Sequence, residues 1–329
     1  VVVWNLTKAC NLDCRFCYYD AKRDSSGNSI DWELAKGIIK QLKDTKVKFV
    51  ILSGGEPLLY SNILGLIEEL TSNLIRVGIS TNGTLIDRKL AVRLKDTGVS
   101  YVGISLDGLE KVHNTLRNSC TAFNQALAGL KNIQEAGIKS GIRLTLNSHN
   151  YPQLEDFFVF AESLKPDRLC FYHLVFTGRA ASADYDLTLD ERRRAVASII
   201  KLTEDWIDRK VTTQVLTVDN FSDAVILLNY VQKTRPDKYA SILKSLKRQG
   251  GCPAGKRILS IDHHGVFHPC QFWQSEDILP HDWKSRLRGR CGACEYKDIC
   301  GGCRVRAHQR YADFLQEDPS CEIDIVEHN

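Results

Sequence analysis

This sequence lacks several features that would each place it in a different class of protein. Among its 329 residues there is no apolar run of the roughly 18 residues that a transmembrane helix needs, so no membrane contact is expected. The chain opens on the strand-like residues 1–4 without a signal-peptide pattern, and this predicts a cytoplasmic protein. Basic and acidic residues nearly balance at 44 and 40, giving a net charge of +4, which indicates neither nucleic-acid nor membrane binding.

Methionine is missing altogether, even at position 1. A chain of this length should contain several, so some spacings can be shorter here than in the natural protein. Spacings inside tight clusters therefore carry more weight than those across long gaps.

Cysteine, in contrast, is abundant and clustered. Three of the twelve cysteines lie near the start of the chain and seven in its last quarter. A secreted disulfide scaffold would be short and rich in cysteine throughout, whereas clustered cysteines in a reducing compartment usually bind metal. Zinc and iron–sulfur clusters both take cysteines at these spacings, and composition does not separate them.

Strand-like and helix-like stretches alternate along the first half of the chain, which predicts an α/β fold built on a parallel sheet. The expected strands, rich in valine and isoleucine, are residues 1–7, 47–53, 75–81, 100–106, 141–147 and 168–175. Amphipathic helices are expected between them, at residues 31–43, 63–70, 88–94, 122–136 and 154–163. Six such units fall short of the eight in a complete barrel, so we predict a partial, (β/α)6 TIM-like barrel.

The rest of the chain is predicted to add a bridging region and a small metal-held domain. A capping box of Thr188 and Glu191 predicts a helix that runs through Trp206. We expect the barrel to occupy residues 1–207, and a bridging region with a strand at 211–217 and a lysine-rich helix to occupy 208–251. Across residues 252–329 helical periodicity weakens, which favours a segment held by metal rather than by an apolar core.

Cys10, Cys14 and Cys17 follow directly on the first expected strand, at the end where barrel enzymes carry their chemistry. Three cysteines this close together can ligate three corners of a [4Fe–4S] cluster and leave the fourth iron open to a ligand. Zinc is the alternative, but a structural zinc site needs a fourth ligand nearby and this loop contains no histidine.

This pattern resembles the radical S-adenosylmethionine (SAM) superfamily, because the residues after the following strands match that family too. Residues 53–57, Ser-Gly-Gly-Glu-Pro, resemble its GGEP motif, which holds the amino group of SAM. The glycines of this motif let the backbone approach SAM closely. The resemblance implies that SAM is contacted by Phe16, Gly54, Gly55, Glu56, Pro57, Ser80, Asn82, Ser105, Asp107 and Arg143. For Arg143 the alternative is a barrel-wall charge paired with a neighbouring acid.

The resemblance further implies a radical SAM enzyme of the oxidoreductase or lyase type. Cys10, Cys14 and Cys17 would be its catalytic cysteines and would hold a [4Fe–4S] cluster that a flavodoxin- or ferredoxin-type partner reduces. The reduced cluster would cleave SAM to methionine and a 5′-deoxyadenosyl radical, which abstracts an unactivated hydrogen atom. The protein would supply orientation and the exclusion of water.

The C-terminal cysteines resemble the SPASM (SPASM/twitch) extension of radical SAM maturases, which carries auxiliary [4Fe–4S] clusters. By this resemblance one complete cluster is held by Cys291, Cys294, Cys300 and Cys321. A second cluster has only three evident cysteine ligands, Cys252, Cys270 and Cys303. Its remaining iron is either open or bound by one of four candidates, Asp262, His263, His264 or His268. The family usually has three residues where this sequence has two, Gly301 and Gly302, and a zinc ribbon is the alternative for four of these cysteines.

Three further stretches, residues 171–179, 215–220 and 262–273, resemble the haem-biosynthetic branch of this superfamily. Its members modify propionate or acetate side chains of a tetrapyrrole in the alternative (sirohaem) haem route or in haem d1 synthesis. A flat macrocycle would suit the aromatic side chains of Tyr172, His173, Phe272 and Trp273, although internal packing explains the last two equally well. Carboxylates of the substrate would pair with Arg179 and with the arginines at 192–194. On this hypothesis, abstraction of a hydrogen atom beta to a propionate carboxylate releases CO2 and leaves a vinyl group, and an auxiliary cluster accepts the remaining electron.

Two other functions stay open. Most SPASM proteins modify peptides, so a peptide maturase that forms a thioether or carbon–carbon crosslink is the alternative. A non-enzymatic iron–sulfur electron carrier is disfavoured by the complete motif at residues 54–57, because a carrier needs no SAM pocket.

Overall fold

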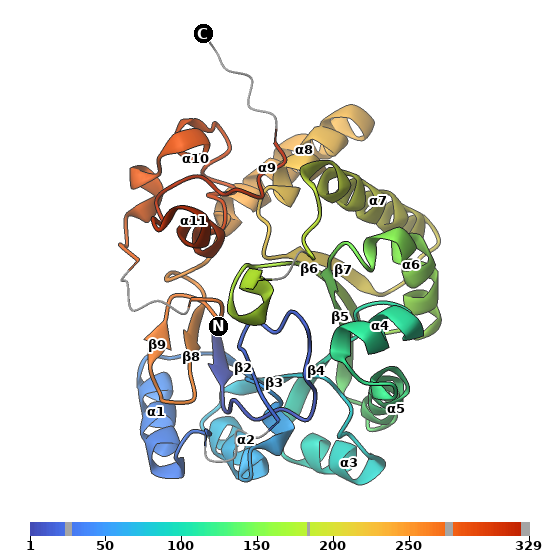
Figure 1. Ribbon diagram of the computed structural model, residues 1–329, viewed down its shortest axis with the longest axis vertical. Helices are drawn as coiled ribbons and strands as arrows, with labels where there is room; N and C mark the ends of the chain where they lie inside the picture. The colour runs from blue at the N-terminus through green and yellow to red at the C-terminus, as the bar shows by residue number, and fades with distance from the viewer. Residues whose placement is uncertain (24–27, 183–184, 274–278, 324–329) are drawn as a thin grey trace.

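The computed structural model describes residues 1–23, 28–182, 185–273 and 279–323, which build one curved sheet with helices outside it (Figure 1). The strand order is β7-β6-β5-β4-β3-β2-β1-β8-β9, and all neighbours are parallel except the antiparallel pair of β8 and β9. The strands are β1 (Val2–Asn5), β2 (Phe49–Ser53), β3 (Arg76–Thr81), β4 (Val99–Ser105), β5 (Lys139–Leu146), β6 (Arg168–His173), β7 (Gln214–Val218), β8 (Leu259–Ile261) and β9 (Phe267–His268).

Helices connect successive strands and lie on the outer face of the sheet, as Figure 1 shows for α1 to α6. In the barrel they are α1 (Trp32–Asp44), α2 (Ile63–Ser72), α3 (Arg88–Asp96), α4 (Glu110–Arg117), α5 (Ala122–Glu135), α6 (Leu154–Ser163) and α7 (Leu189–Asp208). Beyond it are α8 (Asp223–Thr234), α9 (Pro236–Gln249), α10 (Gly289–Ala293) and α11 (Arg304–Tyr311). Short 3-10 helices are η1 (Pro57–Leu59), η2 (Tyr151–Gln153), η3 (Gly178–Ser182) and η4 (Trp283–Arg286).

The sheet is open, because β7 and β9 lie at its two edges and do not pair with each other. The predicted α/β class and partial barrel are therefore confirmed. The first six strands lie where valine and isoleucine predicted them, within three residues at each end.

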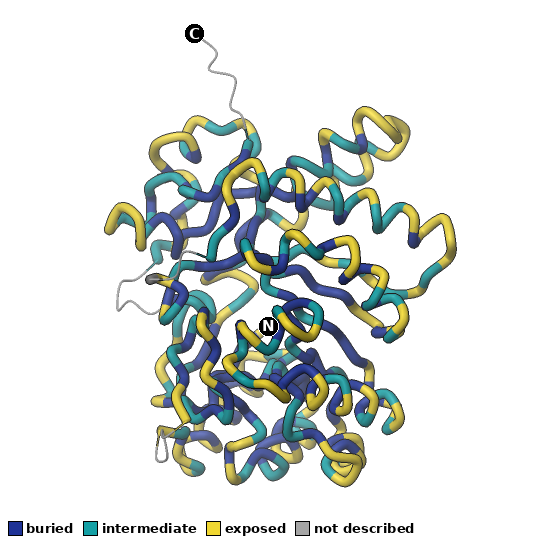
Figure 2. The backbone as a smooth tube through the Cα atoms, turned by 45° about the vertical axis from the view of Figure 1, so that its right-hand side comes forward, coloured by how far each residue is buried: buried dark blue, intermediate teal, exposed yellow. Residues whose placement is uncertain are grey.

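Apolar side chains that are buried on both faces hold the barrel together. The interiors of β2, β3 and β4 contribute Leu52, Val77 and Val102, none of which is exposed. Figure 2 shows that buried residues gather in the interior of the molecule and exposed residues on its outer side. This is the pattern of a parallel sheet covered by helices.

Side-chain caps define where helices begin. The Asp31 carboxylate accepts a hydrogen bond from the Leu34 amide at 3.0 Å and starts α1. Thr188 and Glu191 form the predicted capping box of α7, with bonds of 2.9 and 3.2 Å to each other's backbone amides. None of the helices in the described ranges is long and apolar enough to cross a bilayer.

Two strands join the sheet from parts of the chain that were expected to lie outside the barrel. β7 falls in the predicted bridging region and pairs with β6. β8 falls after Cys252 and pairs with β1, so that Val2 lies opposite Leu259. All three predicted segments thus contribute to one sheet, and their division into domains stays a prediction.

The C-terminal segment is attached to the strand ends of the barrel by one buried arginine. Arg306 on α11 contacts Asp318 at 2.8 Å, and both side chains are buried. The same guanidinium donates to the backbone oxygens of Leu174 and Asp219 at 3.3 and 3.0 Å. One arginine therefore joins the ends of β6 and β7 to the last helix.

Candidate active site and cluster-binding loops

A cavity of about 980 Å³, counting space open to solvent, lies at the carboxyl ends of the parallel strands. This is where barrel enzymes place their active sites. Its wall contains many of the predicted site residues: Cys10, Cys14, Phe16, Cys17, Gly54, Gly55, Ser80, Asn82, Ser105 and Arg143. Of the predicted SAM contacts, Glu56, Pro57 and Asp107 are not among its lining residues.

The three cysteines of the first loop converge on this cavity with N–H groups directed at their sulfurs. The Sγ of Cys10 accepts from the amide of Leu12 at 3.5 Å, and that of Cys17 accepts from Ala21 at 3.5 Å. Arg117 donates to the Sγ of Cys14 at 3.4 Å. Hydrogen bonds to sulfur are a feature of iron–sulfur sites, where they tune the cluster.

Burial favours the protonated thiol at Cys10 and Cys14. It raises the pKa of Cys10 to about 12 and also raises that of Cys14. A thiolate is the form that binds metal, so these side chains need a cationic group beside them to ionise. The arrangement therefore fits an iron cluster, whose positive charge would supply that stabilisation.

Glycines at the end of β2 let the backbone approach the cysteine loop closely. The Gly55 amide donates to the Thr7 carbonyl at 2.7 Å, and a Cβ at position 55 would lie 2.3 Å from the Ala9 oxygen. Gly54 has φ of +133°, a conformation that favours glycine. A side chain at either position would push the loop that bears Cys10 out of place.

Glu56 and Asp107 act behind the cavity wall. The Glu56 carboxylate accepts from Thr81 Oγ1, the Asn82 amide and the Leu58 amide at 2.7, 2.9 and 3.2 Å, so it fixes the neighbouring strand end. Asp107 accepts from the Thr145 amide at 2.9 Å and forms an ion pair with Arg117. A direct contact of Glu56, Pro57 or Asp107 with SAM stays a prediction.

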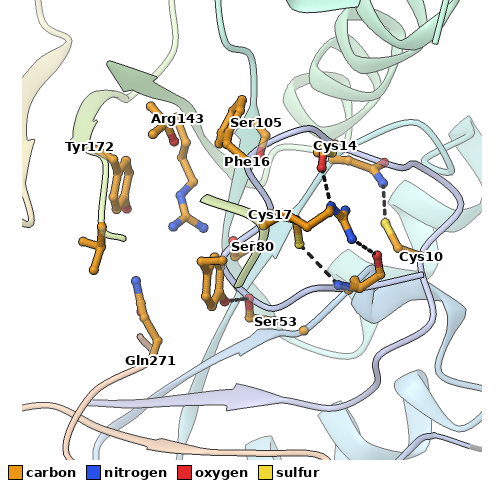
Figure 3. A pocket seen from close by; sticks show the side chains of 18 of the residues that line it. Cys10, Cys14, Phe16, Cys17, Ser53, Ser80, Ser105, Arg143, Tyr172 and Gln271 are labelled. Carbon is orange, nitrogen blue, oxygen red and sulfur yellow. Dashed lines mark hydrogen bonds between the residues drawn. The ribbon is translucent and has the colours of Figure 1, made fainter. Parts of the chain in front are cut away.

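The opposite side of the cavity carries the predicted residues Arg143 and Tyr172 and also residues that the motifs did not identify. In Figure 3, Arg143, Tyr172 and Gln271 lie away from the three cysteines. The Arg143 guanidinium lies 4.5 Å from the centre of the Tyr172 ring. Tyr18 and Asp219 also line this side. The sequence positions of these two residues could have indicated that they line the site, since Tyr18 follows Cys17 directly and Asp219 follows a predicted strand.

Several residues expected to meet a tetrapyrrole already have protein partners. His173 contacts Asp223 at 2.9 Å through Nε2 and Arg192 at 3.1 Å through Nδ1, and all three are buried. Trp273 is buried against Val305 and Phe314. Of the expected aromatic residues, Tyr172, His173 and Phe272 line the cavity. Because both ring nitrogens of His173 have partners, Tyr172 and Phe272 are the candidates for a flat ligand.

The expected arginines also divide between the cavity and the protein interior or surface. Arg179 lines the cavity, but its guanidinium holds the Cys14 carbonyl at 2.8 Å and Asp20 at 3.1 Å. Arg192 pairs with Asp186 at 2.7 Å, and Arg194 donates to the Asp190 carbonyl at 3.3 Å. These arginines stabilise helix α7 and the cysteine loop. Arg117 also lines the cavity but is paired with Asp107, whereas Arg143 lies over the Tyr172 ring.

Four of the seven C-terminal cysteines surround one pocket, and the assignment of the seven to two clusters stays a prediction. Cys291, Cys294, Cys300 and Cys321 line one small pocket. The Cys270 thiol feels the charges of Cys252 and Cys303, which with burial raise its pKa well above the usual value. Amides of Gly302 and Tyr296 donate to the sulfurs of Cys300 and Cys294 at 3.3 and 3.4 Å. All twelve cysteines of the chain are free thiols, which fits ligation by clusters.

The candidates for a further cluster ligand lie in or beside the turn between β8 and β9, and most of them already have hydrogen-bond partners in the protein. His263 Nδ1 contacts the Tyr19 hydroxyl at 2.7 Å, and His268 Nε2 contacts Asp262 at 3.1 Å. His264 is exposed. Within the described ranges, no group of three or more His, Cys, Asp or Glu side chains could hold a single metal ion.

Comparison with known proteins identifies the family. A sequence model described as the Radical SAM superfamily matches residues 4–161. The Fe-coproporphyrin III synthase of Methanosarcina barkeri is 36% identical over 349 residues, covering 98% of this chain and 88% of that protein. The pre-heme d1 synthase of Dinoroseobacter shibae is 32% identical over 351 residues, covering 99% and 87%. Among solved structures, Streptococcus suis SuiB bound to precursor peptide SuiA has a TM-score of 0.75 at 21% identity and covers 98% of this chain and 75% of that one, which shows a shared fold. The chain belongs to the radical SAM superfamily, whose enzymes use SAM and a [4Fe–4S] cluster.

Proposed function

We propose that this enzyme modifies carboxylate-bearing side chains of a tetrapyrrole haem precursor. The observation that carries the proposal is similarity over almost the whole chain to two enzymes named for tetrapyrrole products, at 36% and 32% identity. The cavity supports the proposal, since Arg143 offers a cation, and Tyr172 and Phe272 offer aromatic surface beside the residues expected to contact SAM.

When bound, SAM and the reduced cluster would supply a one-electron cleavage that ends in removal of a hydrogen atom from the substrate. We assign Cys10, Cys14 and Cys17 to the ligation of that cluster and the backbone at Gly54 and Gly55 to SAM. Phe16, buried beside them, would exclude water from the reacting atoms.

The C-terminal cysteines are assigned to two auxiliary clusters, one with four cysteine ligands and one with three. The second, with Cys252, Cys270 and Cys303, is the one next to the cavity, because Cys270 is followed by the cavity-lining Gln271 and Phe272. It would accept the electron left after loss of CO2 from a propionate. A flavodoxin- or ferredoxin-type protein would deliver the electron that starts the reaction.

The test is anaerobic reconstitution with iron and sulfide, followed by SAM cleavage with and without iron-coproporphyrin or didecarboxysirohaem. The proposal predicts that the tetrapyrrole stimulates 5′-deoxyadenosine formation and itself changes mass. Cys14→Ala should abolish cleavage, while Cys120→Ala, at an exposed cysteine, should not.

Two outcomes would contradict the proposal. SAM cleavage that no tetrapyrrole stimulates or couples to a mass change would favour a peptide substrate. Redox activity that survives Cys14→Ala, with no SAM cleavage in the wild type, would indicate an electron carrier.

A further inference from the structure

One stretch of the chain carries cations with no acids to balance them. Residues 238–261 contain six Lys or Arg residues and no Asp or Glu, although basic and acidic residues nearly balance in the whole chain at 44 and 40. The stretch comprises most of α9 and the segment that leads from it into β8. Four of its cations are exposed, and we call them the basic surface: Lys244, Lys247, Arg248 and Lys256. None of the four forms an ion pair within the described ranges.

Helix α9 turns this surface outward. The helix has no fully buried residue, and its apolar side chains pack against Val225 and Leu228 of α8 and against Ile299. Those side chains are Tyr239, Ile242, Leu243 and Leu246. Since a helix advances about 100° per residue, positions 244, 247 and 248 lie on the opposite side.

The cations at the end of α9 are only partly explained by the helix itself. Cations near the last turn stabilise the helix dipole and the last carbonyls. Arg257 and Lys284 already do this, because Arg257 donates to the Gly251 oxygen at 3.3 Å and Lys284 contacts the Gly250 oxygen. The dipole gives no reason for a cation before the last turn, at position 244, or beyond the helix, at position 256.

The basic surface lies beside the place where the two sets of C-terminal cysteines meet. Gly250 and Gly251 lead from α9 directly to Cys252, whose amide donates to the Cys300 carbonyl at 2.9 Å. Gly251 has φ of +59°, and a Cβ there would lie 2.1 Å from that oxygen, so this close approach requires glycine. One hydrogen bond thus joins the loop assigned to the three-cysteine cluster to the loop assigned to the four-cysteine cluster.

We propose that the basic surface is the docking site of an acidic one-electron carrier protein, which removes from the auxiliary clusters the electron that is released with CO2. This inference rests on the proposed function, which assigns the cysteines to clusters and releases one electron in each turnover. One electron enters to cleave SAM and one leaves with the product, so an oxidised carrier that is reduced by one electron closes the balance.

The charge and the size of the surface suit such a partner. Flavodoxins and ferredoxins are acidic, and complementary charge speeds the encounter between two proteins more than it strengthens the complex. Contacts between electron-transfer proteins are also small and short-lived. A few exposed cations beside the cluster loops are therefore enough, and a large apolar interface is not needed.

The test follows electron exchange directly and needs no tetrapyrrole. Reconstituted holoenzyme would be reduced, freed of excess reductant and mixed in a stopped-flow instrument with an oxidised flavodoxin or an oxidised [2Fe–2S] ferredoxin. The second-order rate constant would be measured at ionic strengths of about 0.05 and 0.5 M. With one or both carriers we expect a fall of at least about tenfold at the higher value, because salt screens the attraction that steers association.

The decisive variant reverses three charges of the basic surface, Lys247→Glu, Arg248→Glu and Lys256→Glu together. At low salt its rate constant should be at least about tenfold below that of the wild type, and salt should no longer lower it. Iron content and melting temperature should stay unchanged, because these side chains are exposed and bind no cluster. The corresponding glutamine variant should give an intermediate rate.

A second triple variant controls for the change in net charge. It reverses exposed lysines on the outer helices α1 and α3: Lys40→Glu, Lys43→Glu and Lys89→Glu. Both triple variants change the net charge equally, so only the position of the charges differs. The control should lower the rate constant no more than about threefold and keep the dependence on salt.

Two outcomes would overturn the inference. One is a reversed basic surface that exchanges electrons with both carriers as fast as the control does. The other is a basic surface that binds vesicles of anionic phospholipid, with binding lost on charge reversal while electron exchange stays the same; the surface would then be a membrane contact. If no tetrapyrrole changes mass but charge reversal slows exchange, the proposed substrate is wrong and the docking site stands.

Discussion

Replacing Gly55 by alanine should disable the site without unfolding the barrel. The new Cβ would lie 2.3 Å from the Ala9 oxygen and 2.8 Å from its carbonyl carbon, which are backbone atoms that cannot rotate away. An ordinary contact needs about 1 Å more, and that displacement would break the 2.9 Å bond from the Glu56 amide to Ala9. Cys10 is the next residue and must move with it.

The magnitude follows from these two losses. A net backbone hydrogen bond contributes about 1 kcal/mol and forced overpacking costs about 1–3 kcal/mol. If about 2 kcal/mol of this is expressed as weaker SAM binding, the dissociation constant rises roughly 30-fold. Iron retained at the first cluster should also fall.

The assay is anaerobic calorimetric titration with SAM, together with iron content per chain. The matched control is Gly37→Ala, because position 37 is inside α1 and a Cβ there meets no atom within 4 Å. That variant should bind SAM normally and gain up to about 1 kcal/mol in stability from helix propensity. Wild-type SAM affinity and iron content in Gly55→Ala would refute the reasoning.

Three other perturbations have defined outcomes. Arg306→Met should lower the free energy of unfolding by about 3–5 kcal/mol in chemical denaturation, because it leaves the buried Asp318 carboxylate unpaired. The double variant with Asp318→Asn should recover part of that loss. A double variant that is less stable than Arg306→Met would contradict this reasoning. Arg143→Lys keeps a positive charge but loses the planar contact over the Tyr172 ring. The affinity for SAM or for the substrate should therefore fall, while the melting temperature changes by no more than a few degrees. Unchanged affinity for both ligands would show that Arg143 is a charged residue of the barrel wall that contacts neither ligand. Iron chelation should increase hydrogen exchange across residues 291–303 more than in the barrel strands, because the metal holds this segment; equal protection with and without iron would show that packing suffices.

The barrel could be predicted because its signals are local. Valine- and isoleucine-rich runs and the Thr188–Glu191 capping box specify elements through neighbouring residues alone. Helix α4 was not predicted, because it has only eight residues and buries only His113 and Leu116. The three-residue strand β8 is too short for any pattern, and its pairing with β1 depends on residues more than 250 positions away.

In the site, motifs located the cysteines and glycines but could not decide which charged side chains are available to a ligand. His173 was a candidate for the substrate until the structure showed both its ring nitrogens occupied. Its partners lie 50 residues later and 19 residues later in the chain, a distance over which sequence spacing carries no information. Glu56 is committed to the end of the neighbouring strand β3 in the same way.

The pairing of β1 with β8 has a consequence for how this protein is made. β1 and β2 are synthesised early and can pair while the ribosome still holds the rest of the chain, so the cysteine loop emerges on a strand with one free edge. That edge is covered only when residues 259–261 arrive. Until then the strand that carries the first three cysteines presents unpaired backbone, open both to delivery of iron and to aggregation. The order of translation thus sets a window in which the first cluster site is accessible before the C-terminal cysteines exist.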